Sequence, residues 1–175
     1  MRSLVIALVA AATVSVAAAV AQDSHSSISV GSANARRGET VYGALHVARG
    51  VDAGYDIPVA VVHGARPGKV VAFVSGAHGT EYASVVALTK LISQIDPGKL
   101  SGTAIVVPLL NVASFEKMTP HVNPIDGKGM NSVYPGNPNG TQTERALAAV
   151  ASQVVEPADV VVDLHGGDLD EDLRP

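Results

Sequence analysis

Two apolar runs without any polar alternation restrict most strongly how this chain can fold. They are residues 70–75 (VVAFVS) and 159–164 (DVVVDL). Strands that helices cover on both faces have this composition, and such strands belong to α/β sheets. We therefore predict an α/β fold with a mixed, largely parallel central sheet flanked by helices. Both runs are expected to be central strands, with the ligand site beyond their carboxyl ends.

Further strands and helices are predicted from the spacing of apolar residues. Strands are expected at 57–64 and 103–108, and helices at about 80–94 and 142–155. The turn-rich segment before the last helix gives it Thr141 or Thr143 as a cap, so Glu144 and Arg145 in its first turn are assigned structural roles.

The first 21 residues have the pattern of a signal peptide. Arg2 precedes an almost wholly apolar stretch at 4–20, and Ala19-Val20-Ala21 is a small-x-small cleavage site. We expect cleavage after Ala21, export to the periplasm or beyond, and no stable membrane association afterwards. The alternative is an uncleaved membrane anchor, since about 18 apolar residues just span a bilayer.

The mature chain divides by composition into two regions. Residues 22–55 are expected to form a leader and an N-terminal strand region, with the Ser/Gly-rich segment 22–40 as a mobile leader and entry loop. Residues 56–175 carry the regular pattern. The chain has no cysteine, so a metal site must use His, Asp or Glu. A net charge of −4 without a basic run argues against nucleic acid as a partner.

Histidines in glycine-rich turns follow both apolar runs. His78 and Glu81 lie in GAHGTE after the first run, and His165 lies in DLHGGD after the second. Two histidines, a glutamate and an open position are the ligand set of catalytic zinc, so we expect these three residues to bind Zn²⁺. For the first pair alone, a surface His and Glu at helical spacing is the alternative. Asp163 is expected either to orient a ligand histidine or to cap a backbone amide.

Three ordered segments, SGAHGTEY, NPIDGKGMNSVYPG and VVDLHGGD, resemble the signature segments of the succinylglutamate desuccinylase/aspartoacylase family, which is related to the zinc carboxypeptidases of the M14 type. The resemblance implies that residues 56–175 are the N-terminal part of a zinc hydrolase domain with a carboxypeptidase-like sheet. It also implies hydrolysis of an amide or ester of an N-acyl amino acid-like small molecule by metal-activated water.

The sequence departs from the family pattern at the expected substrate contacts. The family usually has Asn-Arg at the positions of Asn131 and Ser132, and commonly an Arg near the position of His121. We expect all three residues to contact substrate. Because Arg offers a permanent charge and a two-pronged donor that Ser and His lack, we expect a weak hold on a free carboxylate.

The family's general-base glutamate lies well downstream of the third ligand, whereas this sequence ends at Pro175. The catalytic base is therefore unassigned, and we expect the chain to be truncated at its C-terminus. The carboxylates that follow His165 lie too close to it to match that base, and we expect them to form a solvated acidic tail. They are Asp168, Asp170, Glu171 and Asp172. A zinc carboxypeptidase and a catalytically impaired, metal-binding exported domain are the alternatives to a deacylase.

Overall fold

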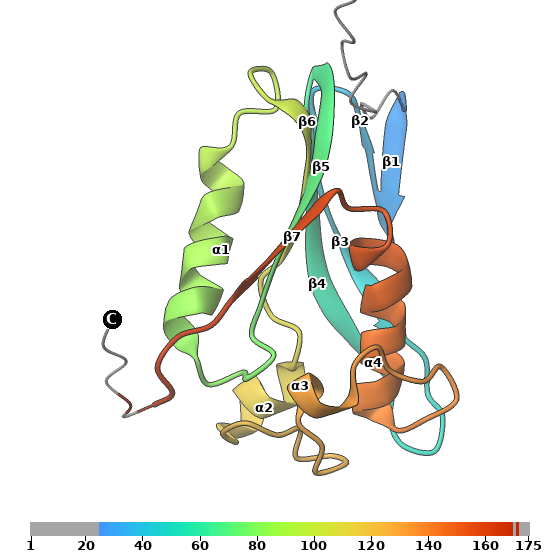
Figure 1. The fold of residues 1–175 in the computed structure, drawn as a ribbon, viewed down its shortest axis with the longest axis vertical. Coiled ribbons are helices and arrows are strands. Elements are labelled where there is room, and N and C mark those ends of the chain that lie inside the picture. Colours follow the sequence, from blue (N-terminus) through green and yellow to red (C-terminus); the bar gives the residue numbers. More distant parts are fainter. Residues whose placement is uncertain (1–24, 170, 172–175) are drawn as a thin grey trace, which may run out of the picture.

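A twisted sheet with helices on both sides forms the body of the molecule (Figure 1). The computed structural model describes residues 25–169 and residue 171. Their elements, in chain order, are β1 (Ser27–Val30), β2 (Ala33–Arg36), β3 (Glu39–Val47), β4 (Tyr55–His63), β5 (Arg66–Ser75), α1 (Tyr82–Gln94), β6 (Ser101–Val107), α2 (Val112–Lys117), α3 (Met130–Val133), α4 (Gln142–Val150), a π-helical turn η1 (Ala151–Val155) and β7 (Val160–Leu164).

The main sheet is mixed, as predicted from the sequence. Its strand order is β3-β4-β6-β5-β7, with β4 antiparallel to both of its neighbours and β5 parallel to β6 and β7. Ser75 at the end of β5 pairs with Leu164 at the end of β7. The loops that follow these strands therefore leave the sheet at the same edge, where ligand sites of parallel sheets lie.

Two apolar cores hold the layers together. On one face, Leu88 and Ile92 of α1 pack against the sheet through residues that include Val62 and Val106. On the other face, α4 and the two-stranded β1–β2 sheet pack against the sheet, and Leu147 belongs to that core. Figure 1 shows α1 alone on one side and α4 with β1 and β2 on the other.

The expectation of a mobile leader and entry loop over 22–40 is wrong for its described part. Residues 27–36 form the antiparallel β1–β2 pair, and β3 begins at Glu39. Val30, Ala33 and Ala35 are buried in the larger core. Small alanines fill that core between polar neighbours, and they gave a weaker apolar signal than larger side chains would. The predicted signal peptide, 1–21, lies outside the described residues.

The strand β7 lies at the edge of the sheet and not at its centre. Among the described residues it pairs with β5 alone, and Val160, Val161 and Val162 are 50%, 40% and 37% exposed. The prediction that helices cover both of its faces is therefore wrong for this chain. The composition of a strand indicates whether its side chains favour burial. Whether they are buried depends on which other elements pack against the strand.

The start of α4 agrees with the assignment of structural roles. Thr141 and Glu144 form a reciprocal capping box, and Lys128 contacts the same carboxylate at 2.9 Å. Hydrogen bonds from Lys128 and from the backbone and side chain of Thr141 lower the pKa of Glu144 to about 2. Arg145 is buried and pairs with Asp52 at 2.7 Å, so it anchors the segment between β3 and β4 to this helix.

None of the helices among residues 25–169 combines the length and the apolar character that a membrane span requires.

Candidate metal centre

The turn after β5 is shaped by two glycines. Gly76 has a positive φ of 68°, a conformation that favours glycine. A Cβ at Gly79 would lie 2.3 Å from the backbone nitrogen of Phe115, so only glycine allows α2 to approach this closely. The two glycines allow the chain to turn from β5 into α1, and His78 lies between them in this turn.

Side chains from the loop before α2 and from α2 itself hold this turn in place. Asn111 caps α2 by accepting a hydrogen bond from the Ser114 amide, and its own amide donates to the carbonyl of Ala77. The Ser114 hydroxyl accepts the amide hydrogen of Gly79 at 3.0 Å. Asn111 therefore fixes this loop, and the backbone around His78 is rigidly held.

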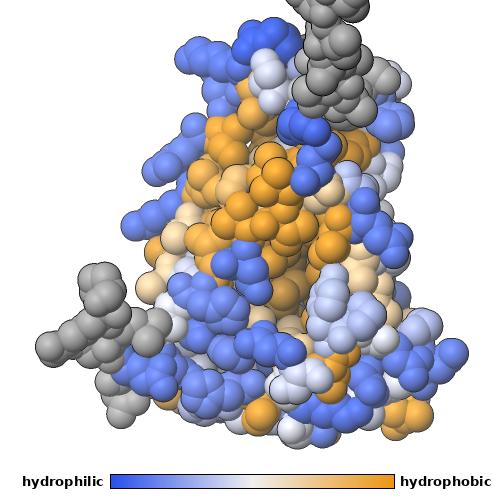
Figure 2. Space-filling view, in the orientation of Figure 1, coloured by the Kyte–Doolittle hydropathy of each residue, from blue (hydrophilic) through white to orange (hydrophobic). Residues whose placement is uncertain are grey.

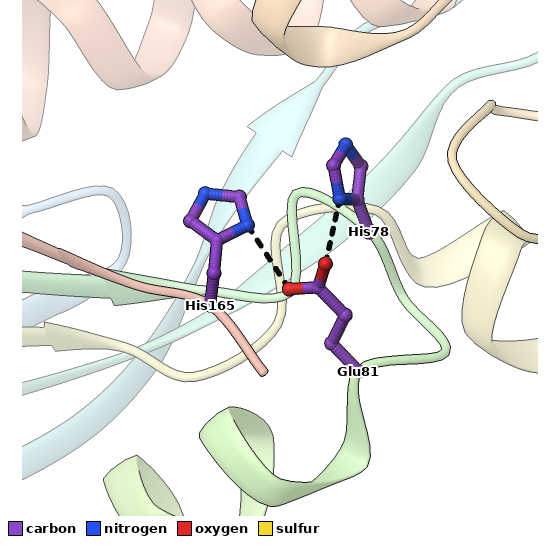
Figure 3. A group of neighbouring side chains, drawn as sticks. All are labelled: His78, Glu81 and His165. Carbon is purple, nitrogen blue, oxygen red and sulfur yellow. Dashed lines mark hydrogen bonds and ion pairs between the residues drawn. The ribbon is translucent and has the colours of Figure 1, made fainter. Parts of the chain in front are cut away.

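The structure brings His78, Glu81 and His165 together, as predicted (Figure 3). Glu81 is the N-cap residue of α1, and its side chain is only 7% exposed. One carboxylate oxygen lies 2.8 Å from Nδ1 of His78, and the other lies 3.0 Å from Nδ1 of His165. The amide of Gly166 also donates to the second oxygen at 3.1 Å. The carboxylate therefore links the ends of β5 and β7.

The three side chains fit a zinc ion by donor type and by distance. Their possible ligand atoms all lie within 4.8 Å of one another. Two atoms that each lie about 2.0–2.2 Å from a shared zinc ion are at most about 4.4 Å apart, so small side-chain rotations suffice to close the site. Exposure of the His165 side chain, at 35%, leaves the site open toward solvent.

The other ring nitrogens of both histidines also have polar neighbours. Nε2 of His165 lies 3.4 Å from a carboxylate oxygen of Asp163, and Nε2 of His78 lies 3.3 Å from the side-chain amide of Asn131. Outer partners of this kind hold a ligand imidazole in one orientation and tautomer. The geometry favours the orienting role of Asp163 over the capping role, and it gives Asn131 a similar place beside His78.

We expect the substitution Asp163→Asn to weaken zinc binding by about 10-fold without abolishing it, because the outer partner orients the ligand but does not bind the metal. Competition with a chromophoric zinc chelator measures the change. An unchanged dissociation constant would show that Asp163 does not orient His165.

His121 lies beside the three candidate ligands, with its ring centroid 5.3 Å from that of His78 in an edge-to-face arrangement. Its Nε2 lies 3.6 Å from the carboxylate of Asp168.

Asp168 is 4% exposed, so its assignment to a solvated acidic tail is wrong. Glu171 is exposed, whereas Asp170 and Asp172 lie outside the described residues. Ser132 is exposed on α3, next to Asn131.

A cavity of about 400 Å³ adjoins the metal centre on the side of α4 and β7. Asn131, Tyr134 and Asp163 supply polar groups to its wall, and most of the remaining wall is apolar, including Met130 and Val161. Figure 2 shows a broad apolar area in the middle of this face of the molecule. No local pattern in the sequence indicated this cavity, because its wall combines residues from five separate segments.

The mixed sheet with helices on both faces defines an α/β protein with the aspartoacylase and carboxypeptidase-like fold. The model of the succinylglutamate desuccinylase/aspartoacylase catalytic domain matches residues 67–171. The chain therefore belongs to the succinylglutamate desuccinylase/aspartoacylase family, whose members are deacylases, and the resemblance noted in the sequence is confirmed.

Individual relatives agree with this assignment. The chain is 34% identical over 119 residues to an N-alpha-acetyl-L-2,4-diaminobutyric acid deacetylase from Halomonas elongata, covering 68% of this chain and 34% of the relative. An aspartoacylase family protein from Mesorhizobium loti superposes with a TM-score of 0.68 at 28% identity, covering 72% of this chain and 40% of the other. A succinylglutamate desuccinylase/aspartoacylase from Rhodobacter sphaeroides gives a TM-score of 0.63 at 26% identity, covering 71% and 39%. The chain thus spans about a third to two fifths of the length of these relatives.

Proposed function

We propose that this chain carries the zinc-binding part of a zinc-dependent deacylase that hydrolyses an amide or ester bond of an N-acyl amino acid-like small molecule. The observation that carries the proposal is the pair of short contacts from the Glu81 carboxylate to Nδ1 of His78 and Nδ1 of His165. A zinc ion, when bound there, polarises a carbonyl group and lowers the pKa of water. Membership of a deacylase family supports the reaction class.

Different residues of this chain bind the metal, orient its ligands and contact the substrate. His78, Glu81 and His165 hold the metal, while Asp163 and Asn131 orient the two imidazoles from outside. The backbone amide of Gly166 holds the Glu81 carboxylate in place. The cavity beside the metal centre offers an apolar wall to one part of the substrate.

Charge around the site supports a weak hold on a free carboxylate. Lys128 and Arg145, which lie on the segments around α3 and α4, are already paired with Glu144 and Asp52. Ser132 and His121 offer no permanent charge. We therefore expect an N-acyl amino acid and its C-terminal amide to be hydrolysed with kcat/KM values within about 10-fold of each other, since one missing ion pair is worth about 1.4 kcal/mol or less. A strong preference for the free acid, measured with the zinc-loaded protein, would refute this expectation.

A catalytically impaired, metal-binding domain is the second candidate. It is favoured by the surroundings of the metal centre, where the carboxylates among the described residues contact histidines or backbone amides, and Asp168 is buried. A protein that binds one zinc ion per chain yet hydrolyses neither an N-acyl amide nor the matching ester supports this candidate. Turnover that disappears when zinc is chelated and returns when zinc is restored supports the deacylase.

We also propose that the chain is exported and acts on its small-molecule substrate outside the cytoplasm, without a nucleic-acid partner. The proposal is supported by the sequence of residues 1–21 and by the absence of a basic run. We expect the mature protein to begin at Gln22, and N-terminal sequencing of protein from the expressing cells measures this. An intact Met1 in the exported fraction would contradict cleavage.

A further inference from the structure

A buried carboxylate oxygen without a hydrogen-bond partner lies next to the metal centre. Oδ2 of Asp168 makes no hydrogen bond to any described residue, although the side chain is only 4% exposed. The other oxygen of the same carboxylate accepts the amide hydrogen of Leu169 at 2.9 Å. An unpaired buried polar atom costs about 1–3 kcal/mol, more when the group is charged, so such atoms are uncommon without a function.

The ring of His121 is the donor that this oxygen faces. Nε2 of His121 lies 3.6 Å from Oδ2, which is beyond hydrogen-bond length but within reach of a small ring rotation. His121 also has a positive φ of 63°, which is uncommon for a residue other than glycine. The backbone thus holds His121 in an unusual conformation that directs its ring at both Asp168 and His78.

An ionised carboxylate accepts hydrogen bonds only, so closing this contact requires the hydrogen of the neutral imidazole to be on Nε2. Nδ1 of His121 is then an acceptor with no partner among the described residues. The side chain is 56% exposed and lies against His78, so this acceptor is available to a substrate at the metal centre. The nearby negative charge of Asp168 disfavours a substrate carboxylate at this place.

We propose that Asp168 is a positioning residue that fixes the Nε2–H tautomer of His121, so that Nδ1 accepts a hydrogen bond from the N–H of an amide substrate. This inference rests on the proposed deacylase function for its substrate, whereas the tautomer of His121 does not depend on turnover. A hydrogen bond to Nδ1 of His121 favours an N-acyl amide over the corresponding ester, because an ester oxygen cannot donate to Nδ1.

The first test is nitrogen-15 NMR of the histidine rings in the zinc-loaded protein, with the His121 signals assigned by their loss in His121→Gln. We expect the Nε2–H tautomer in the wild type and a shift toward Nδ1–H in Asp168→Asn, since an amide presents a donor as well as an acceptor. Glu116→Gln is the matched control, because Glu116 is an exposed carboxylate of α2 that makes no hydrogen bond or ion pair with Asp168 or His121, and this variant should keep the wild-type tautomer. Zinc content should be equal in all these proteins.

Kinetics with an N-acetyl amide and the matching O-acetyl ester form the second test. Asp168→Asn should lower kcat/KM for the amide by about 3- to 10-fold, the value of one hydrogen bond, and for the ester by less than about twofold. The same tautomer in the wild type and in Asp168→Asn, or equal losses on both substrates, would overturn the proposal. If Asp168→Asn does not fold, an Nδ1–H tautomer in the wild type overturns it alone, and an Nε2–H tautomer supports it. If neither substrate is hydrolysed, the deacylase function fails, while the NMR result still decides the role of Asp168.

Discussion

Replacing His165 with Ala is expected to lower zinc affinity by more than about 100-fold, beyond the roughly 10- to 100-fold loss that follows removal of an outer partner. His165 supplies one of the two imidazoles around Glu81, and it directly follows β7. Metal binding is coupled to folding, so zinc at about 1,000 times the wild-type dissociation constant should stabilise the wild type by about 4 kcal/mol. The variant should gain little at the same concentration. Isothermal titration calorimetry and thermal unfolding with and without zinc measure both effects.

His46→Ala is the matched control for that substitution. His46 lies on β3, is 72% exposed, and contacts a carboxylate, Asp56, at 2.7 Å much as His165 contacts Glu81. Its removal should change neither the affinity for zinc nor the stabilisation that zinc brings. Equal zinc binding by His165→Ala and the wild type would refute the assignment of His165 as a ligand.

Replacing Arg145 with Met should reduce the free energy of unfolding by about 3–5 kcal/mol, because it leaves a mostly buried carboxylate without its partner. The Arg145 side chain is 7% exposed and that of Asp52 is 19% exposed. The guanidinium also donates to the carbonyl oxygens of Ala48 and Gly140, which would lose this donor. Urea denaturation followed by circular dichroism measures the change.

Lys69→Met tests whether the loss of stability expected for Arg145→Met depends on the burial of the ion pair or on the distance between its charged atoms. The ion pair of Lys69 with Asp159 has the same 2.7 Å separation, but its side chains are 49% and 29% exposed. Exposed pairs contribute about 1 kcal/mol or less, so this variant should be only slightly destabilised. Similar losses in the two variants would show that the burial of Arg145 does not explain its importance.

The sequence predicted the parts of this fold that depend on strong local patterns. The long apolar runs and the helical spacing identified β4 to β7, α1 and α4 close to their observed bounds. The glycine-rich turns after β5 and β7 also predicted that His78, Glu81 and His165 meet, since parallel neighbouring strands end at the same edge.

Other features depend on contacts between distant segments, which a single sequence does not contain. The β1–β2 pair is held by small residues such as Ala33 and Ala35, whose burial becomes visible only when the core is assembled. The edge position of β7 depends on what lies beside it and not on its composition. Asp168 looks like part of an acidic tail in the sequence, and only its return toward His121 reveals a buried carboxylate.

The binding of zinc between His78, Glu81 and His165 is the claim on which the proposed function depends most directly. Crystals of the zinc-loaded protein, measured at the zinc absorption edge, locate the ion by anomalous scattering without assumptions about its ligands. The structure predicts one strong peak about 2.0–2.2 Å from a carboxylate oxygen of Glu81 and from one ring nitrogen of each histidine. A zinc peak elsewhere, with none within bonding distance of these three side chains, would contradict the account.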